Sequence, residues 1–220
     1  SMDGVSRIRL YLEDTESSRQ EIDALRAKLA DFRAENPSAP LGSLRVRYET
    51  MRDEDWENSW KQYYQPLAIG RRLLVVPEWL DPENPDGRIT VRLDPGMIFG
   101  TGQHASTRMC MEALENAIRG GETVLDLGSG SGILSIAALQ LGAKSAAGVD
   151  IDPKAEDIAR ENAAMNGIGA DRFTAMTANV LDDHSPLSHL YHKCDVVLAN
   201  IVADVIIPLA PVVPEFLTDG

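Results

Sequence analysis

The chain has 220 residues, 44% of them hydrophobic and 25% charged, and its 34 acidic residues outnumber 21 basic ones to give a net charge of −13. This length suits one substantial core and a smaller unit. No apolar run is long enough to cross a membrane, and the N-terminus lacks the basic and apolar pattern of a signal peptide. We therefore predict a cytoplasmic protein without membrane attachment.

The net charge limits the choice of partner. Nucleic-acid binders neutralise phosphates with Lys and Arg, yet the largest basic cluster that we find is the pair Arg71 and Arg72. We expect no direct binding of nucleic acid. A basic protein partner fits the charge, although acidity alone also keeps a protein in solution.

The cysteines and histidines predict no metal site. Cys110 and Cys194 show no zinc-ligand spacing, so we interpret both as reduced, small hydrophobic side chains. His184, His189 and His192 lie in a polar stretch without a partner at ligand spacing, which favours a solvated loop.

Residues 1–52 are expected to form a partial α+β domain. Alternating apolar residues predict strands over residues 5–12 and 44–48. Between them, Ser18 and Glu21 form a capping box, which is typical of a helix start, and an Asn-Pro pair ends the helix. Because a strand, a helix and a strand are too few for a stable unit, we expect upstream residues to be missing.

A linker helix is predicted over residues 53–66. Its acidic beginning suits a helix N-terminus, and Trp56 and Trp60 share one face, which favours interdomain packing over ligand binding. Two further strands are predicted over residues 73–76 and 89–93, separated by a turn-rich stretch.

Residues 93–107 form a polar segment that contains glycine. Its central glycines permit unusual backbone angles. The hydroxyl groups of Thr101, Ser106 and Thr107 offer hydrogen bonds just before a predicted helix. The composition is that of a flexible loop.

A strand, tight turn and helix are predicted around the alternate glycines Gly128, Gly130 and Gly132. The apolar residues 124–127 are too few for a helix, and a small-residue helical pattern follows the glycines. A second apolar run ends in Asp150, which places a carboxylate at the carboxyl end of the neighbouring parallel strand. That carboxylate can accept hydrogen bonds from both hydroxyl groups of a ribose.

The spacing of the glycines limits the class of cofactor that the turn can bind. A dinucleotide fingerprint needs a third glycine where this chain has Ile133. This disfavours an oxidoreductase that uses a nicotinamide dinucleotide. A nucleoside cofactor without phosphate fits the spacing.

Another buried-looking strand, residues 195–199, ends in Asn200 at the same edge of the predicted sheet. Asn200 either contacts the ligand or caps the following helix, a role that Asp204 could also fill. An apolar helix is predicted over residues 205–213. Since the chain ends where another strand is expected, we predict an open sheet edge at residues 195–199 and absent C-terminal strands.

These segments resemble the PrmA family, the bacterial methyltransferases of the eleventh protein of the large ribosomal subunit. The resemblance rests on residues 93–107, the glycine motif, residues 150–153 and residues 197–201. It departs at Gln103 and at Ala105-Ser106.

The resemblance implies a fold: a Rossmann-like class I methyltransferase domain over residues 67–220, with a doubly wound, mostly parallel sheet, preceded by a partial ferredoxin-like α+β domain. It also implies S-adenosylmethionine as cofactor, bound by Thr107, Gly128, Asp150 and Asn200.

Gly130, in the same turn, is assigned to the cofactor as well. Asn200 is the predicted catalytic residue, and His104 is either catalytic or fixes its loop by a hydrogen bond to the backbone.

The implied activity is methyl transfer to α-amino and lysine ε-amino groups of a basic ribosomal protein. Two alternatives stay open: a lysine methyltransferase that acts on another cytosolic protein, and a non-catalytic adaptor that keeps the fold.

Overall fold

The computed structural model describes most of the chain, and two compact units, residues 1–63 and 64–220, divide it. The described residues are 12, 15–37, 39, 42–48, 61, 64–95, 104–182 and 185–218. Each unit is described by itself. No helix in these ranges is long and apolar enough to span a membrane.

The first unit contains helix α1, Glu16–Glu35. Its N-cap is Thr15, whose hydroxyl accepts a hydrogen bond from the Ser18 backbone N–H at 3.1 Å. The predicted start at Ser18 is wrong by one turn, because Thr15 is the residue with the extended backbone that a cap needs. The Asn-Pro pair ends the helix as predicted, with Asn36 as C-cap.

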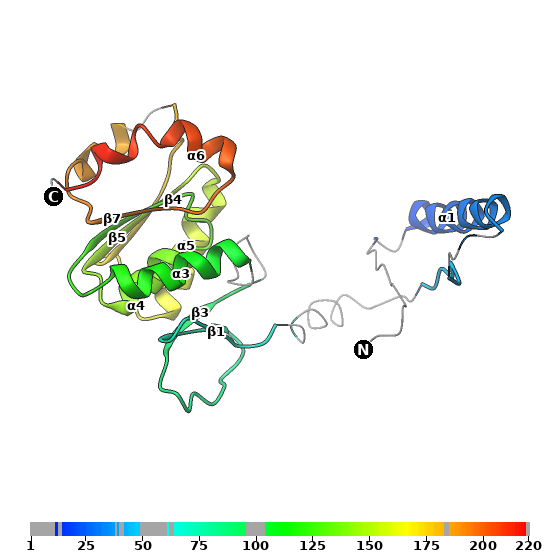
Figure 1. Cartoon of the computed structure of the whole chain (residues 1–220), viewed down its shortest axis with the longest axis horizontal. Coiled ribbons are helices and arrows are strands. Elements are labelled where there is room, and N and C mark those ends of the chain that lie inside the picture. Colours follow the sequence, from blue (N-terminus) through cyan, green and yellow to red (C-terminus); the bar gives the residue numbers. More distant parts are fainter. Residues whose placement is uncertain are drawn as a thin grey trace. The chain divides into compact units, whose positions relative to one another are not determined.

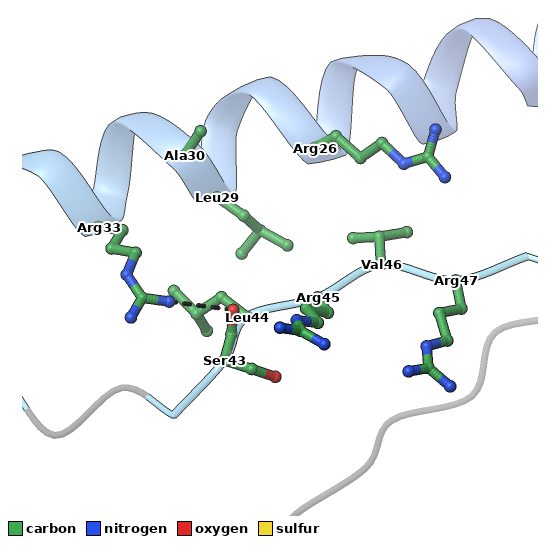
Figure 2. Close-up of a pocket in the computed structure, with 9 residues that line it drawn as sticks. All are labelled: Arg26, Leu29, Ala30, Arg33, Ser43, Leu44, Arg45, Val46 and Arg47. Atoms are coloured by element: carbon green, nitrogen blue, oxygen red, sulfur yellow. Dashed lines mark hydrogen bonds between the residues drawn. The ribbon is translucent and has the colours of Figure 1, made fainter.

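The predicted strand over residues 44–48 is wrong. These residues pair with no described strand, and Leu44 has a φ of 46°, which a β-strand does not allow. Residues 43–47 and α1 instead line a cavity of about 440 Å³, where Arg33 Nη1 donates to the Ser43 carbonyl at 3.0 Å (Figure 2).

Two other predictions for this region, the strand over residues 5–12 and the linker helix with Trp56 and Trp60, lie almost entirely outside the described residues. The ferredoxin-like domain stays a prediction.

The second unit opens with a small sheet in the order β1-β2-β3. Its strands are β1 Leu67–Ile69, β2 Leu73–Pro77 and β3 Ile89–Leu93. Strand β2 pairs antiparallel with β1 and parallel with β3, so the two strands predicted here are confirmed.

The main sheet is four-stranded and parallel, in the order β6-β5-β4-β7. Its strands are β4 Thr123–Leu127, β5 Ser145–Asp150, β6 Phe173–Thr177 and β7 Val196–Ala199. Helices α3 Ala105–Ala117, α4 Ile133–Leu141 and α5 Pro153–Met165 cover one face, and α6 Ala203–Leu209 covers the other (Figure 1). The predicted doubly wound α/β fold is confirmed.

Side chains of the central strands point alternately to the two faces of the sheet and contribute to two hydrophobic cores. Val124 and Ala146 belong to the cluster under α3, α4 and α5, whereas Leu125 and Ala147 belong to the cluster on the opposite face. Successive side chains of a strand point to opposite faces, so a strand buried on both faces is apolar along most of its length.

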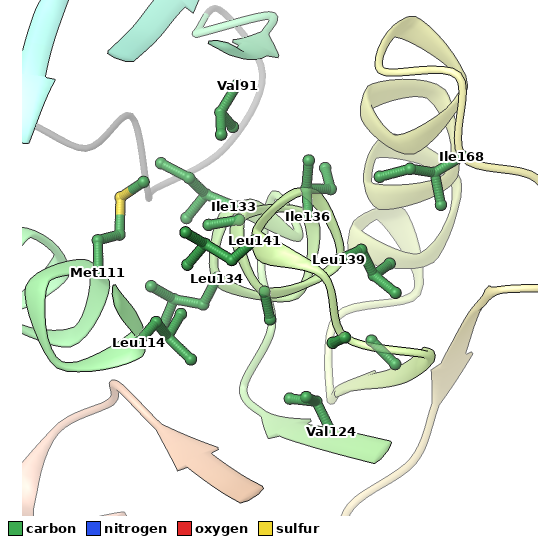
Figure 3. Packing of buried hydrophobic residues seen from close by; sticks show 14 of the residues in the cluster. Val91, Met111, Leu114, Val124, Ile133, Leu134, Ile136, Leu139, Leu141 and Ile168 are labelled. Atoms are coloured by element: carbon green, nitrogen blue, oxygen red, sulfur yellow. The ribbon is translucent and has the colours of Figure 1, made fainter. Parts of the chain in front are cut away.

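Helix α4 lies at the centre of the first core. Eight of its nine residues are buried, which is typical of a helix surrounded by protein. Figure 3 shows its side chains extending around the helix toward Val91, Met111 and Val124. The helix that follows the glycines is therefore held from several sides.

The C-terminal apolar stretch forms two elements instead of the predicted single helix. Helix α6 ends at Leu209, and a separate 3-10 helix, η3, spans Val213–Glu215. Pro211 explains the break, because it has no N–H to donate to the Ile207 carbonyl and so cannot extend the helix.

Candidate functional site

The register of the main sheet brings three predicted site residues to one edge. Leu127 is paired with Val149 on β5 and with Ala199 on β7. Gly128, Asp150 and Asn200 each come one residue after, at the carboxyl ends of adjacent strands. Ligands of open α/β sheets bind at this edge.

The glycine turn has a backbone that only glycine adopts easily. Gly128, Gly130 and Gly132 have φ angles of 77°, 50° and 77°. A Cβ at Gly128 would lie 2.2 Å from Ile201 Cγ2, and one at Gly132 would lie 3.0 Å from the Ala159 Cβ. The turn therefore needs glycine both for its angles and for its close neighbours.

Asp150 ties the glycine turn to the end of β5. Its Oδ2 accepts the Gly130 N–H at 2.8 Å, and its Oδ1 accepts the Asp152 N–H at 3.0 Å. A carboxylate offers about four acceptor positions. Each oxygen therefore keeps capacity for one more donor, as two ribose hydroxyls would require.

Asp126, inside β4, is a buried acid that is not among the predicted site residues. Its Oδ2 accepts from Ser135 N at 3.2 Å and Ser135 Oγ at 2.8 Å, and its Oδ1 is buried with no hydrogen-bond partner among the described residues. Burial raises the pKa of Asp126 to about 6, the bonds from Ser135 oppose this, and the charge of Asp150 adds to it. A charged residue in the middle of an apolar strand was the signal available in the sequence.

Asn200 meets Thr107 across 93 residues of sequence. Asn200 Nδ2 donates to Thr107 Oγ1 at 3.0 Å, and Thr107 is 1% exposed. The N-cap residue of helix α6 is Val202, and no side chain makes a capping hydrogen bond there. The capping alternative for Asn200 and Asp204 is therefore wrong.

His104 is the N-cap residue of α3 and makes no side-chain cap hydrogen bond, while its carbonyl accepts the Arg108 N–H at 3.1 Å. Thr101 and the glycines before it lie outside the described residues. Within the described ranges, no group of His, Cys, Asp and Glu could hold a metal ion. Cys110 and Cys194 are free, and burial raises the pKa of Cys194 to about 11.

A family model described as ribosomal protein L11 methyltransferase (PrmA) matches residues 5–220. Proteins named ribosomal protein L11 methyltransferase from Pelotomaculum thermopropionicum and Pelobacter propionicus are 39% and 40% identical to the chain over 99% and 100% of its length. The chain covers 67% and 70% of these two relatives, and 52% of a 46% identical relative from Desulforamulus reducens.

A solved structure is similar as well. The crystal structure of a ribosomal protein L11 methylase from Lactobacillus delbrueckii subsp. bulgaricus is 37% identical, with a TM-score of 0.62 over 70% of this chain and 76% of that one.

Proposed function

Because the chain belongs to the family of ribosomal protein L11 methyltransferases, we propose that it transfers methyl groups from S-adenosylmethionine to ribosomal protein L11 in the cytoplasm. The family predicted from the sequence is confirmed. So are the enzyme class, an S-adenosylmethionine-dependent protein methyltransferase, and its cofactor. The observation that carries the substrate is the family match, which runs through both units and every residue of the site.

The described residues fit S-adenosylmethionine. The glycine turn lies at the edge of the sheet where ligands of open α/β folds bind, and Asp150 keeps acceptor capacity for the two ribose hydroxyls. Thr107 and Asn200 follow at the same edge of the sheet, and we assign them to the cofactor too. S-adenosylmethionine carries no phosphate, so this edge of the sheet needs no phosphate-binding group.

Asn200 is the residue that we place beside the acceptor amine. Its Nδ2 is engaged by Thr107, so Oδ1 is the side-chain atom left to accept an N–H and to aim the nitrogen lone pair. When bound, S-adenosylmethionine supplies a methyl carbon activated by its sulfonium, which the lone pair attacks as the carbon–sulfur bond breaks.

The acceptor amine must be neutral to attack. At pH 7 a lysine with a pKa near 10.4 costs about 4 to 5 kcal/mol to deprotonate, and an α-amine with a pKa near 8 costs about 1 kcal/mol. Desolvation of the amine lowers either pKa. We propose both kinds of amine as acceptors.

We assign recognition of the protein substrate to residues 1–52, the linker helix to residues 53–66 and catalysis to residues 67–220. The net charge of −13 favours a basic protein over RNA. The two alternatives, a lysine methyltransferase for another cytosolic protein and a non-catalytic adaptor, become outcomes of the test.

The test is to incubate the chain with methyl-labelled S-adenosylmethionine and, separately, ribosomal protein L11, another basic ribosomal protein, and ribosomal RNA. Mass spectrometry should locate label on amines of L11 alone. Because the nucleophile is neutral, methylation of lysine should rise about tenfold per pH unit between pH 7 and 9, whereas that of an α-amine should level off near pH 8. Label on RNA, or on another protein in place of L11, contradicts the proposal, and no label on any of the three is the outcome expected of a non-catalytic adaptor.

Calorimetry tests the cofactor contacts. Asp150→Ala should weaken S-adenosylmethionine binding by about 2 kcal/mol, roughly thirtyfold, because it removes hydrogen bonds to a charged group. The matched control is Asp157→Ala, which removes a carboxylate with an 80% exposed side chain on α5. Unchanged affinity in a folded Asp150→Ala variant would rule out the ribose role.

A further inference from the structure

One face of α5 contacts the glycine turn. Ala159 lies against Gly132, where a Cβ would be 3.0 Å from the Ala159 Cβ. One turn further along, Asn162 Nδ2 donates to the Ser131 carbonyl at 2.8 Å. Both α5 residues are 0% exposed. The turn is therefore braced by a helix that contains none of the residues assigned to the cofactor.

The same asparagine reaches a second segment. Asn162 Oδ1 accepts the Asp94 backbone N–H at 3.0 Å. Asp94 follows β3 and begins the sequence segment that leads to Thr107. One buried amide thus joins the glycine turn to the start of the segment that carries a proposed cofactor contact.

Asn166, one turn beyond, holds β3 itself. Its Oδ1 accepts the Arg92 N–H at 2.8 Å and its Nδ2 donates to the Arg92 carbonyl at 2.7 Å, as a neighbouring strand would. Its third side-chain hydrogen bond goes to the Asn162 carbonyl at 2.7 Å, so its side-chain bonds reach neither the glycine turn nor Asp94. The two asparagines therefore separate two tasks, anchoring β3 and joining the two segments of the site.

We propose that Asn162 is a positioning residue for the cofactor, setting the place of the Ser131 carbonyl relative to the backbone of Asp94. A buried amide with a donor and an acceptor is suited to this, because losing either partner leaves a buried polar group unpaired. Asn162 touches no reacting atom and acts through the backbone at both sides. This inference rests on the proposed function, which makes the glycine turn a cofactor site.

The experiment compares Asn162→Ala with the matched control Asn166→Ala. In the whole chain, Asn162→Ala should raise the Kd for S-adenosylmethionine at least tenfold, measured by calorimetry on the folded fraction. Asn166→Ala loses three side-chain hydrogen bonds, against two in Asn162→Ala, but should change the Kd less than threefold. Without cofactor, the Asp94 amide should exchange hydrogen faster in Asn162→Ala than in the unmodified chain, because its acceptor is gone.

A second variant, Asn162→Asp, is isosteric and keeps the test decisive if Asn162→Ala does not fold. Its protonated form can still accept from Asp94 and donate to Ser131, so at pH 5 its Kd should lie within threefold of the unmodified chain. As the pH rises to 8 and the donor is lost, its affinity should fall relative to the unmodified chain.

The outcomes separate this inference from the proposed function. Absence of S-adenosylmethionine binding by the unmodified chain overturns the proposed function and the cofactor role of Asn162 together. Normal binding by the unmodified chain, with equal effects in Asn162→Ala and Asn166→Ala or no pH dependence in Asn162→Asp, overturns the inference alone.

Discussion

The two sides of the site are built differently. On the glycine side, Asp126, Asp150 and Asn162 hold the turn and the helix after it through four hydrogen bonds of 2.8 to 3.2 Å. On the other side, among the described residues, one hydrogen bond of 3.0 Å joins Thr107 to Asn200.

This difference matches the two halves of the proposed reaction. A cofactor with a fixed shape benefits from a preorganised site, since less ordering is needed on binding. The Asn200 side has to admit an amine on a protein, and its lighter restraint leaves room for adjustment. Substitutions on the glycine side should therefore act mainly on stability and cofactor affinity, and those on the other side mainly on turnover.

The largest effect is expected for Gly128→Ala. The new Cβ would overlap Ile201 Cγ2 at 2.2 Å and hold a φ of 77°. Backbone strain and overpacking together should lower the free energy of unfolding by about 2 to 5 kcal/mol in urea denaturation. Adding Ile201→Ala should recover part of this loss.

The matched control for that substitution is Gly167→Ala. Gly167 has a similar φ of 68°, but nothing lies within 4 Å of its Cβ position. It should lose only about 1 kcal/mol, from strain alone. Equal losses at both glycines would show that Ile201 does not constrain the turn.

Asp126→Asn should change the pH dependence of stability. The pKa of Asp126 rises from 3.8 to about 6 in the fold, so its stabilising contribution is complete below pH 3.8 and is lost as the pH rises through 6. The loss amounts to roughly 3 kcal/mol, and asparagine avoids it because it cannot ionise.

Urea denaturation at pH 4 and pH 7 checks this. The stability of Asp126→Asn relative to the unmodified chain should increase by up to about 3 kcal/mol between these values. Asp157→Asn, on the exposed face of α5, should show no such increase. A pH-independent difference for Asp126→Asn would contradict the raised pKa.

Thr107→Val should have the smallest effect on stability. It removes one hydrogen bond, so unfolding should become easier by only about 1 kcal/mol. Because the amide of Asn200 loses its orientation, kcat should fall at least tenfold. Ser106→Ala, next to it but exposed, is the control. A loss of stability as large as that of Gly128→Ala would remove the contrast between the two sides.

Interactions between residues close in sequence were enough to predict much of this fold. The glycine turn and the parallel strands that end at Asp150 and Asn200 were predicted because each depends on neighbours in sequence. The start of α1 and the break after α6 were misplaced, because competing caps and prolines a few residues apart decided them.

By itself, the sequence determined the α/β class, the edge of the sheet where the site lies, and the family. Only the tertiary structure decided that Thr107 meets Asn200, that Asn162 joins Ser131 to Asp94, and that Asp126 is buried with one unpaired oxygen. The reason is physical: turns and caps form between residues close in sequence, whereas burial and partner choice for a polar side chain depend on segments that only folding brings together.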